Sequence, residues 1–266
     1  RHEDPVNGKL YSDMNALLLK YIIEEVSGFS FEEYLHKNVF AVLGMKETFS
    51  TVPKNRVQDC LNYNYEHQID KDSYIIQKDA VPGTAHDPKA RLLMMGGMGL
   101  QGHAGLFSSS QDMVRFAQGL LRGDLLDRKW LLEIGKNRTG KLVPGQYRQF
   151  LGFLCFAKSP VQYLSELPQW MGPAAFGIAG YTGNHIAIDP EIGAFDILLG
   201  NRCHMRVSKI EPMLLAKEKY SLSREGAGWI KWPDGRQVKS SFQYVHQKDE
   251  LIHNPVYHEL KKRSWI

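Results

Sequence analysis

The sequence predicts an α+β domain in which helices pack against an antiparallel sheet. Three observations predict this class. Apolar residues recur at helical spacing through much of the first half, strand-like segments fill the second half, and the two kinds of segment follow one another in blocks. Of the 266 residues, 43% are hydrophobic and 23% are charged. Such a chain can bury a core, which excludes a disordered protein.

The overall charge and the cysteines exclude several classes of function. The net charge of +4 is mild, and no basic block or basic-aromatic stripe accompanies it, so we expect no nucleic-acid partner. No apolar run approaches the ~20 residues that span a bilayer, so we expect no transmembrane segment in this chain. Cys60, Cys155 and Cys203 are far apart and form no C-x-x-C pair, which indicates free buried thiols rather than a disulfide framework or a zinc knuckle.

The first helix follows a loop-like opening segment. Ser12 and Asp13 are good N-cap residues, apolar residues recur at helical spacing over 17–26, and Gly28 is a typical stop. The apolar face of this helix is wide. We therefore expect the face to be buried in a core.

Local capping signals predict three more helices. Ser30 and Glu33 form a capping box, in which a hydroxyl and a carboxylate three residues apart satisfy each other's free amides. The pair Asp87-Pro88 opens another helix, because proline suits the first helical position. Ser109 caps a third helix, and Gly123 ends it.

The second half predicts mainly strands. Residues 150–157 read as a buried strand, and residues 178–189 and 194–200 read as a pair joined by a hairpin turn at 190–193. In the first half, by contrast, residues 51–85 predict a long connection with short strands near Tyr63 and over 74–76.

Three shorter segments complete the expected elements. We expect a short helix over 129–134, a helix over 210–219 and a hairpin with a Pro-Asp-Gly turn over 229–235.

Generic catalytic motifs are absent from the sequence. It contains no G-x-S-x-G elbow, Walker loop, Rossmann fingerprint or H-E-x-x-H. His253 and His258 lie five residues apart without a clear partner cluster, so we expect both at the surface and no metal site.

One ordered set of segments does stand out. It resembles the serine β-lactamase and penicillin-binding-protein superfamily, in particular the class C-type branch near penicillin-binding protein 4B. The resemblance covers roughly residues 11–215. It is carried by the following segments in this order: Tyr11-Ser12-Asp13, Leu17-Leu18, Glu24-Glu25-Val26-Ser27-Gly28, Val42-Leu43-Gly44-Met45-Lys46-Glu47-Thr48, His86-Asp87-Pro88-Lys89-Ala90-Arg91, Gly102-His103-Ala104-Gly105-Leu106-Phe107-Ser108, Gly180-Tyr181-Thr182-Gly183, Ile188-Asp189-Pro190 and Leu198-Leu199-Gly200-Asn201-Arg202.

The resemblance implies acyl-transfer chemistry. In that superfamily a serine in Ser-x-x-Lys attacks an amide, lactam or ester carbonyl, and the lysine and the tyrosine of a Tyr-x-Asn motif move protons. The substrate would be a peptidoglycan peptide ending in D-Ala-D-Ala, a β-lactam or a small ester, and no cofactor is implied. It also implies a β-lactamase/transpeptidase-like fold with a helical subdomain. Relatives often work outside the cytoplasm.

Two residues match the tyrosine motif. Tyr11 matches the catalytic tyrosine, and the alternative is an aromatic that packs before the helix. Asp13 stands where many relatives have asparagine, so an ionised side chain can accept but not donate a hydrogen bond. The alternative for Asp13 is a simple helix cap.

The match to the Lys/His-Thr-Gly strand is degenerate. Counting back from Ile188-Asp189-Pro190 places this substrate-binding motif at Ile178, Ala179 and Gly180. Neither of the first two side chains can bind a carboxylate, whereas the Tyr181 amide could supply one oxyanion donor.

The glycine-rich loop matches a segment beside the active site of the family. His103 and Gly105 are its candidate site residues. They either contact substrate or simply form and pack a tight turn.

The nucleophile is missing, because no serine in the sequence has a lysine three residues later. In the family this motif precedes the tyrosine motif. We therefore expect residues 1–218 to be the C-terminal portion of a β-lactamase-like domain, incomplete at its N-terminus and inactive as given. Residues 219–266 would form an extension that matches no known segment.

Two other interpretations remain open. In one, the protein is a non-catalytic β-lactamase-like binding protein, which the altered positions 178 and 179 favour. In the other, the motif matches are due to chance in an unrelated α+β protein. That interpretation predicts that Tyr11 and Gly180 lie far apart.

Overall fold

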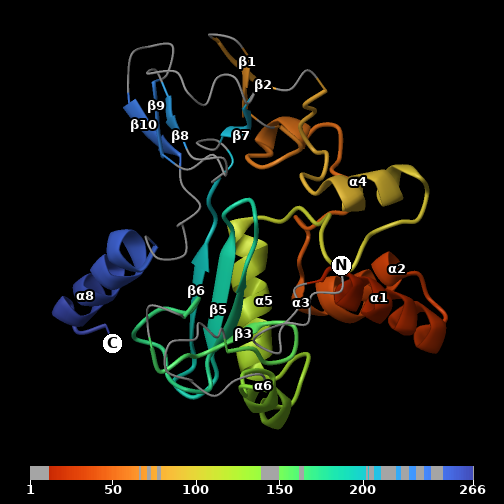
Figure 1. Cartoon of the computed structure of the whole chain (residues 1–266). Helices are drawn as coiled ribbons and strands as arrows, with labels where there is room; N and C mark the ends of the chain where they lie inside the picture. Colours follow the sequence, from red (N-terminus) through yellow and green to blue (C-terminus); the bar gives the residue numbers. More distant parts are fainter. Residues whose placement is uncertain are drawn as a thin grey trace.

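The computed structural model contains ten helical segments and ten strands among the residues it describes (Figure 1). It describes residues 12–65, 67–70, 73–76, 79–138, 150–161, 165–201, 203, 207–210, 220–222, 228–231, 237–240 and 248–265. The helical segments are α1 (Met14–Ser27), α2 (Phe31–Leu35), η1 (His36–Phe40), α3 (Ala41–Leu43), η2 (Val57–Asp59), α4 (Pro88–Met95), α5 (Ser110–Arg122), α6 (Arg128–Ile134), η6 (Asp249–His253) and α8 (Asn254–Lys262). The strands are β1 (His67–Asp70), β2 (Ser73–Ile76), β3 (Phe156–Ala157), β4 (Phe176–Ala179), β5 (His185–Asp189), β6 (Ala194–Leu198), β7 (Val207–Ile210), β8 (Tyr220–Leu222), β9 (Gly228–Lys231) and β10 (Gln237–Ser240).

A four-stranded antiparallel sheet in the order β3-β4-β5-β6 lies at the centre. Its β4–β5 register pairs Ile178 with Ile186, so these two side chains share one face of the sheet. Helix α5 covers that face, where Ala117 and Leu120 pack against Phe176 and Ile188. This arrangement confirms the predicted α+β class with helices against a sheet (Figure 1).

The opposite face of the sheet carries different side chains. Ala187 on this face is fully buried and packs with Leu167, Met171 and Ala175. The C-terminal segment η6–α8 also lies on this side, at the left of Figure 1. Two smaller three-stranded sheets have the orders β2-β1-β7 and β10-β9-β8.

The predicted caps are confirmed. Ser30 and Glu33 make both hydrogen bonds of a capping box at the start of α2. Asp87 caps α4 by accepting from the amides of Lys89 and Ala90, with Pro88 in the first turn. Ser109 accepts from the Asp112 amide at the start of α5.

The predicted helix stops and the short helix are also confirmed. Gly28 and Gly123 end their helices with positive φ angles of 70° and 86°, which glycine adopts without strain. Helix α6 occupies the segment predicted at 129–134.

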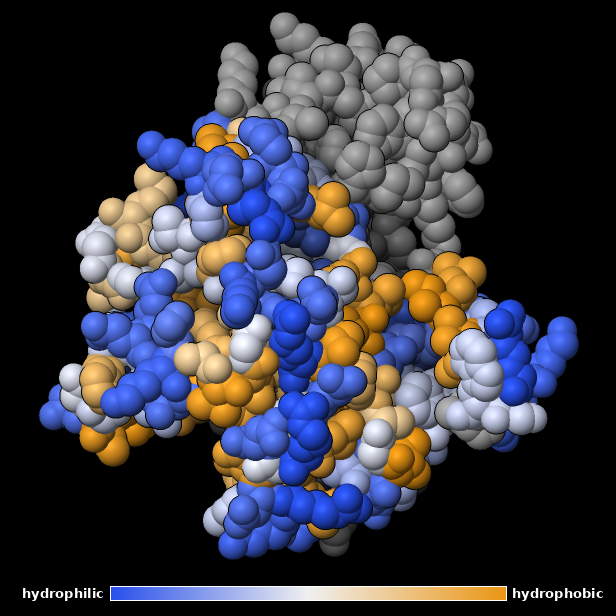
Figure 2. All heavy atoms as spheres, turned by 180° about the vertical axis from the view of Figure 1, so that it is seen from behind, coloured by the Kyte–Doolittle hydropathy of each residue, from blue (hydrophilic) through white to orange (hydrophobic). Residues whose placement is uncertain are grey.

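The predicted burial of α1 is wrong. Leu18 and Ile22 are each 55% exposed and Val26 is 83% exposed, whereas Lys20 is buried and pairs with Glu24. These apolar residues are exposed because the helix docks through another side, where Ala16 and Lys20 lie. Gly102 approaches the carbonyl of Ala16 so closely that a Cβ at position 102 would lie under 3.0 Å from it. Figure 2, seen from behind, shows hydrophobic side chains at the surface on the side where α1 lies.

Several strand boundaries also differ from the prediction. Only residues 156–157 of the predicted strand 150–157 form a strand, because the chain turns back at Gly152–Cys155 and Leu154 has a positive φ of 51°. The predicted strand 178–189 divides into β4 and β5 around a turn in which the Gly183 amide donates to the Gly180 carbonyl. The β5–β6 hairpin around 190–193 is confirmed.

The remaining predictions lie at the edges of the described residues. Tyr63 is not in a strand, whereas β2 confirms the strand over 74–76. Ile210 ends β7 rather than starting a helix, and residues 211–219 lie outside the described part. Strands β9 and β10 pair as the predicted hairpin around 229–235, although the turn itself is not described.

Candidate active site

The start of α1 carries the first candidate residues. Asp13 occupies the N-cap position, but its side chain makes no capping hydrogen bond. The Ser12 hydroxyl instead accepts from the Met14 amide at 3.2 Å. The Asp13 carboxylate forms an ion pair with Lys89 of α4. The helix-cap alternative for the Asp13 side chain is therefore wrong, and this side chain joins two distant segments. Tyr11 lies outside the described residues.

The start of α4 is the centre of the arrangement. The Asp87 carboxylate accepts hydrogen bonds from the amides of Lys89 and Ala90 at 2.9 and 2.8 Å. Its Oδ1 also lies 3.1 Å from Nε2 of the His103 ring. Partial burial acts to raise the pKa of Asp87, but the Ala90 amide and the His103 ring outweigh it and hold that pKa below its ordinary value. Asp87 is therefore a carboxylate at neutral pH.

Asp87 orients the ring of His103. Because the Asp87 carboxylate can only accept, Nε2 of His103 is the donor in their contact. Nδ1 of His103 is buried and has no hydrogen-bond partner among the residues that the structure describes. Gly105 in the same loop has a φ of 117°, a conformation that side chains other than that of glycine rarely adopt. The turn alternative thus has a structural basis, and contact with substrate stays a prediction.

The end of β4 and the turn that follows carry the residues predicted to match the substrate-binding strand motif. The side chains of Ile178 and Tyr181 are 50% and 48% exposed, and Ala179 is partly buried. The Gly180 amide donates to the Asn184 carbonyl at 2.7 Å. The Tyr181 ring lies 5.4 Å from the ring of His86, the residue before Asp87.

These contacts bring four of the predicted segments together. The segment 86–89 contacts the start of α1 through Lys89, the loop at 102–105 through Asp87, and the β4–β5 turn through His86. Asp13 and Tyr181, which are 168 positions apart in the chain, thus both contact the same four-residue segment. The separation of Tyr11 from Gly180, which the chance-match interpretation predicts to be large, lies outside the described residues, but the neighbouring Asp13 and Tyr181 meet around one segment.

Packing explains Gly177 of β4 and leaves Gly180, the residue after β4, unexplained. A Cβ on Gly177 would lie under 3.0 Å from the Ile186 carbonyl, so the neighbouring strand requires glycine there. A Cβ on Gly180 would meet its nearest atom, the Asn184 carbonyl oxygen, at 3.6 Å, an ordinary contact. None of the described residues therefore requires glycine at position 180.

The comparison with protein families identifies the fold. A family model described as Beta-lactamase matches residues 2–217, most of the chain. The chain belongs to the beta-lactamase family. The recognition made from the ordered segments is confirmed, and the α+β architecture is that of a beta-lactamase-like domain.

Known proteins of this beta-lactamase family are similar but distant. The "Putative D-alanyl-D-alanine carboxypeptidase" of Salmonella gallinarum is 29% identical over 242 residues, which are 85% of this chain and 52% of that protein. This chain therefore spans about half the length of the curated relatives it matches. The octameric penicillin-binding protein homologue from Pyrococcus abyssi (21% identity, TM-score 0.48) aligns with 73% of this chain and 39% of its own. A penicillin binding protein from Bacillus halodurans (18% identity, TM-score 0.48) aligns with 75% of this chain and 53% of its own.

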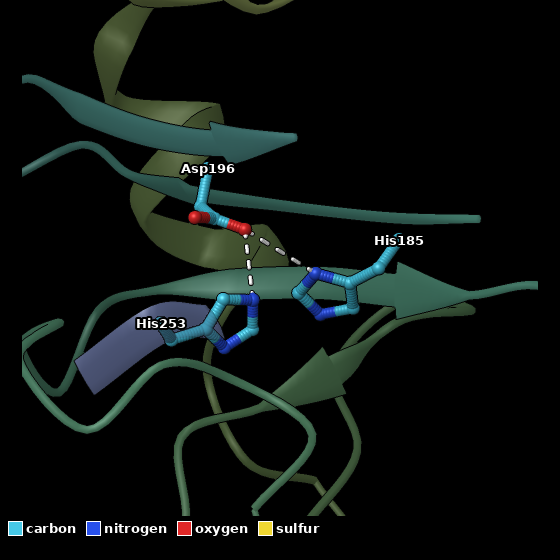
Figure 3. Close-up of side chains that lie close together, drawn as sticks. All are labelled: His185, Asp196 and His253. Carbon is cyan, nitrogen blue, oxygen red and sulfur yellow. Dashed lines mark ion pairs between the residues drawn. The ribbon is translucent and has the colours of Figure 1, made fainter. Parts of the chain in front are cut away.

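A second group of titratable side chains lies on the face of the sheet away from α5. Nδ1 of His185, Oδ1 of Asp196 and Nε2 of His253 all lie within 4.8 Å of one another (Figure 3). The expected surface position of His253 is wrong, since its side chain is fully buried, whereas His258 is exposed as predicted. Sequence reasoning missed the group because its members come from β5, β6 and η6. Only the sheet register could have linked His185 to Asp196.

No helix in the described part of the chain combines the length and apolar character needed to cross a membrane.

Proposed function

We propose that this chain contributes one wall of an acyl-transfer site of the serine hydrolase type. In the complete protein this site would act on D-Ala-D-Ala peptides, β-lactams or small esters. The observation that carries the proposal is the meeting of four motif segments around the start of α4, in a chain that belongs to the beta-lactamase family.

The proposed roles follow the family chemistry. Tyr11 would move a proton to or from the reacting groups, and Asp13 would accept a hydrogen bond beside it while Lys89 holds its carboxylate. Gly180 and Tyr181 would form the edge along which the acyl group lies. The absence of a packing reason for glycine at 180 supports this role, because close approach of a ligand is a common reason for a glycine in an extended segment.

No Ser-x-x-Lys motif occurs in the sequence, and we propose that this chain by itself is inactive. Incubating it with a fluorescent penicillin and a fluorophosphonate probe should give no covalently labelled band on a denaturing gel. A labelled band that survives denaturation would refute this part of the proposal.

Binding can be tested separately from catalysis. We expect a D-Ala-D-Ala peptide to shift the amide resonances of residues 180–181 in NMR titrations, and we expect Gly180→Ala to weaken that binding because the new Cβ fills space beside the strand edge. Ile192→Ala in the β5–β6 turn is the control, since Ile192 is 59% exposed and should not affect binding. Equal binding by the two variants would remove Gly180 from the site.

A second candidate is a non-catalytic binding protein. Ile178 and Ala179 favour it, because neither can hold a substrate carboxylate or relay a proton. The gene sequence that precedes Arg1 distinguishes the two candidates. A Ser-x-x-Lys motif there supports an enzyme with an altered pocket, and a natural protein without one supports the binding protein.

A further inference from the structure

We propose that His185, Asp196 and His253 bind a divalent transition-metal ion, with zinc as the best match, that fastens the C-terminal segment to the central sheet. This inference is independent of the proposed acyl-transfer function.

The sheet register places two of the three side chains together. Asp196 of β6 pairs with Ala187 of β5, and His185 lies two residues before Ala187 on the same face of β5. Diagonal neighbours of this kind are within reach of long or aromatic side chains. His253, at the end of η6, supplies the third side chain, and Figure 3 shows it beside His185 and Asp196.

The distances suit a small ion with nitrogen and oxygen ligands. His253 Nε2 lies 3.0 Å from Asp196 Oδ1, and His185 Nδ1 lies 3.7 Å from the same oxygen. Ligand atoms about 2.05 Å from a tetrahedral ion are roughly 3.3 Å apart. The two observed distances lie on either side of that value. The third pair of atoms, His185 Nδ1 and His253 Nε2, lies within 4.8 Å, so an ion would have to draw the two nitrogens to a tetrahedral separation. The three side chains leave one position for a fourth ligand.

The outer contacts orient both imidazoles. His253 Nδ1 lies 2.9 Å from Asp249 Oδ1, and His185 Nε2 lies 2.8 Å from the Glu166 carbonyl. Since the carbonyl can only accept, the proton of a neutral His185 is on Nε2 and the lone pair of Nδ1 faces the Asp196 carboxylate. A metal-binding histidine commonly donates its other ring proton to a carboxylate or carbonyl in this way.

The converging atoms have no other partner in the described residues. Apart from one another, His185 Nδ1, Asp196 Oδ1 and His253 Nε2 have no polar partner there, and all three atoms are buried. Two lone-pair acceptors facing each other in a buried site are unfavourable, and a cation between them removes the repulsion. Two imidazoles and a carboxylate select zinc or a neighbouring transition metal over magnesium or calcium, which prefer oxygen ligands.

A proton is the main competitor for this position. Burial lowers the pKa of His185, which opposes an imidazolium there. For His253, burial acts in the same direction but the carboxylates of Asp196 and Asp249 outweigh it and raise the pKa. The buried Lys248 beside the group, 3.9 Å from Glu166, opposes any added cation. A metal ion and a proton therefore compete for the position between His253 Nε2 and Asp196 Oδ1.

Burial indicates a structural ion rather than a catalytic one. The side chains of His185 and His253 are fully buried and that of Asp196 is 18% exposed. Structural zinc sites are closed to substrate, and burial closes this one, although a fourth ligand such as a water molecule would be needed to complete the tetrahedron. The ion would add to the stacking of Trp170 on Tyr257, which joins α8 to the same side of the sheet.

The test is metal binding by the whole chain. Protein stripped with a chelator is titrated with zinc chloride against a chromophoric competitor, and we expect one equivalent to bind and to raise the melting temperature. Cobalt(II) should give the intense visible absorption of a four-coordinate site. His258→Ala, on the exposed side of α8, is the matched control and should bind as wild type does.

Two variants examine the ligands. His253→Ala should lose stoichiometric binding, and Asp249→Ala, which keeps all three ligands, should weaken zinc binding by about 10- to 100-fold. If His253→Ala fails to fold, the Asp249 variant and the cobalt spectrum still decide the question. Failure of wild-type protein to bind one equivalent of zinc would overturn the proposal, as would equal zinc affinity of wild type and both variants. A buried proton-linked network would then explain the group.

Discussion

Replacing Asp112 with alanine should be among the most destabilising single changes in this chain. Asp112 lies in the first turn of α5 and is fully buried. Its carboxylate accepts from the Glu47 amide at 2.6 Å, from the Thr48 hydroxyl at 2.9 Å and from the Arg115 guanidinium at 2.7 Å. The side chain thus joins α5 to the segment that follows α3.

The expected loss follows from these three partners. A hydrogen bond to a charged group contributes about 1.5–3 kcal/mol, and removing one member of a buried charged network costs roughly 3–5 kcal/mol. Arg115 is 37% exposed and can turn to solvent, so the main loss comes from the Glu47 amide and the Thr48 hydroxyl. We expect Asp112→Ala to lower the unfolding free energy by about 3–4 kcal/mol, which corresponds to a melting temperature roughly 6–16 °C lower.

Urea unfolding followed by tryptophan fluorescence measures this change, and hydrogen exchange at the Glu47 amide reports the local contact. The matched control is Asp124→Ala, two residues beyond the end of the same helix, where an exposed carboxylate pairs with Arg122. Exposed pairs contribute about 1 kcal/mol or less. If the two alanine variants unfold within about 1 kcal/mol of each other, the energetic reasoning about Asp112 is wrong.

Three further predictions use the same structure. Burial lowers the pKa of Lys158 to about 8, so between about pH 8 and 10.5 the unfolded state binds more protons than the folded state. The unfolding free energy of wild type should therefore rise relative to that of Lys158→Met over this pH range. A difference in unfolding free energy that stays constant with pH in urea titrations would contradict this. Burial raises the pKa of Cys155 to about 11, which lowers the fraction of reactive thiolate at pH 8. Iodoacetamide at pH 8 should therefore alkylate Cys155 roughly 200-fold more slowly in native than in urea-unfolded protein. Equal alkylation rates in the two states, measured by mass spectrometry, would contradict the raised pKa. Gly177→Ala should destabilise the sheet by more than 1 kcal/mol, whereas Gly180→Ala should stay within about 0.5 kcal/mol of wild type; thermal melts with the reverse order would contradict the assigned packing.

Elements with short-range causes could be predicted from the sequence. The capping box at Ser30, the Asp87-Pro88 helix start and the glycine stop at Gly28 each depend on hydrogen bonds or backbone angles within a few residues. The β5–β6 hairpin was predictable for the same reason. The order of the motif segments also indicated the family, because it is a property of the linear chain.

Contacts between distant segments could not be predicted. Asp13 had the local signal of a helix cap, yet its carboxylate pairs with Lys89 on another helix. His253 looked like a surface residue, but the docking of η6 buries it against Asp196. The apolar residues of α1 predicted burial, while the side that docks is the one near Ala16 and Lys20.

The sequence by itself therefore determined where the capped helices start and stop and where the β5–β6 hairpin lies, and its ordered segments indicated the beta-lactamase family. Only the tertiary structure decided which of those segments meet at the start of α4 and that two histidines and an aspartate converge behind the sheet. The physical reason is range. Caps and turns are stabilised by groups a few residues apart, whereas a site depends on strand register and on which face of each helix packs, and these are set by the burial of the whole chain.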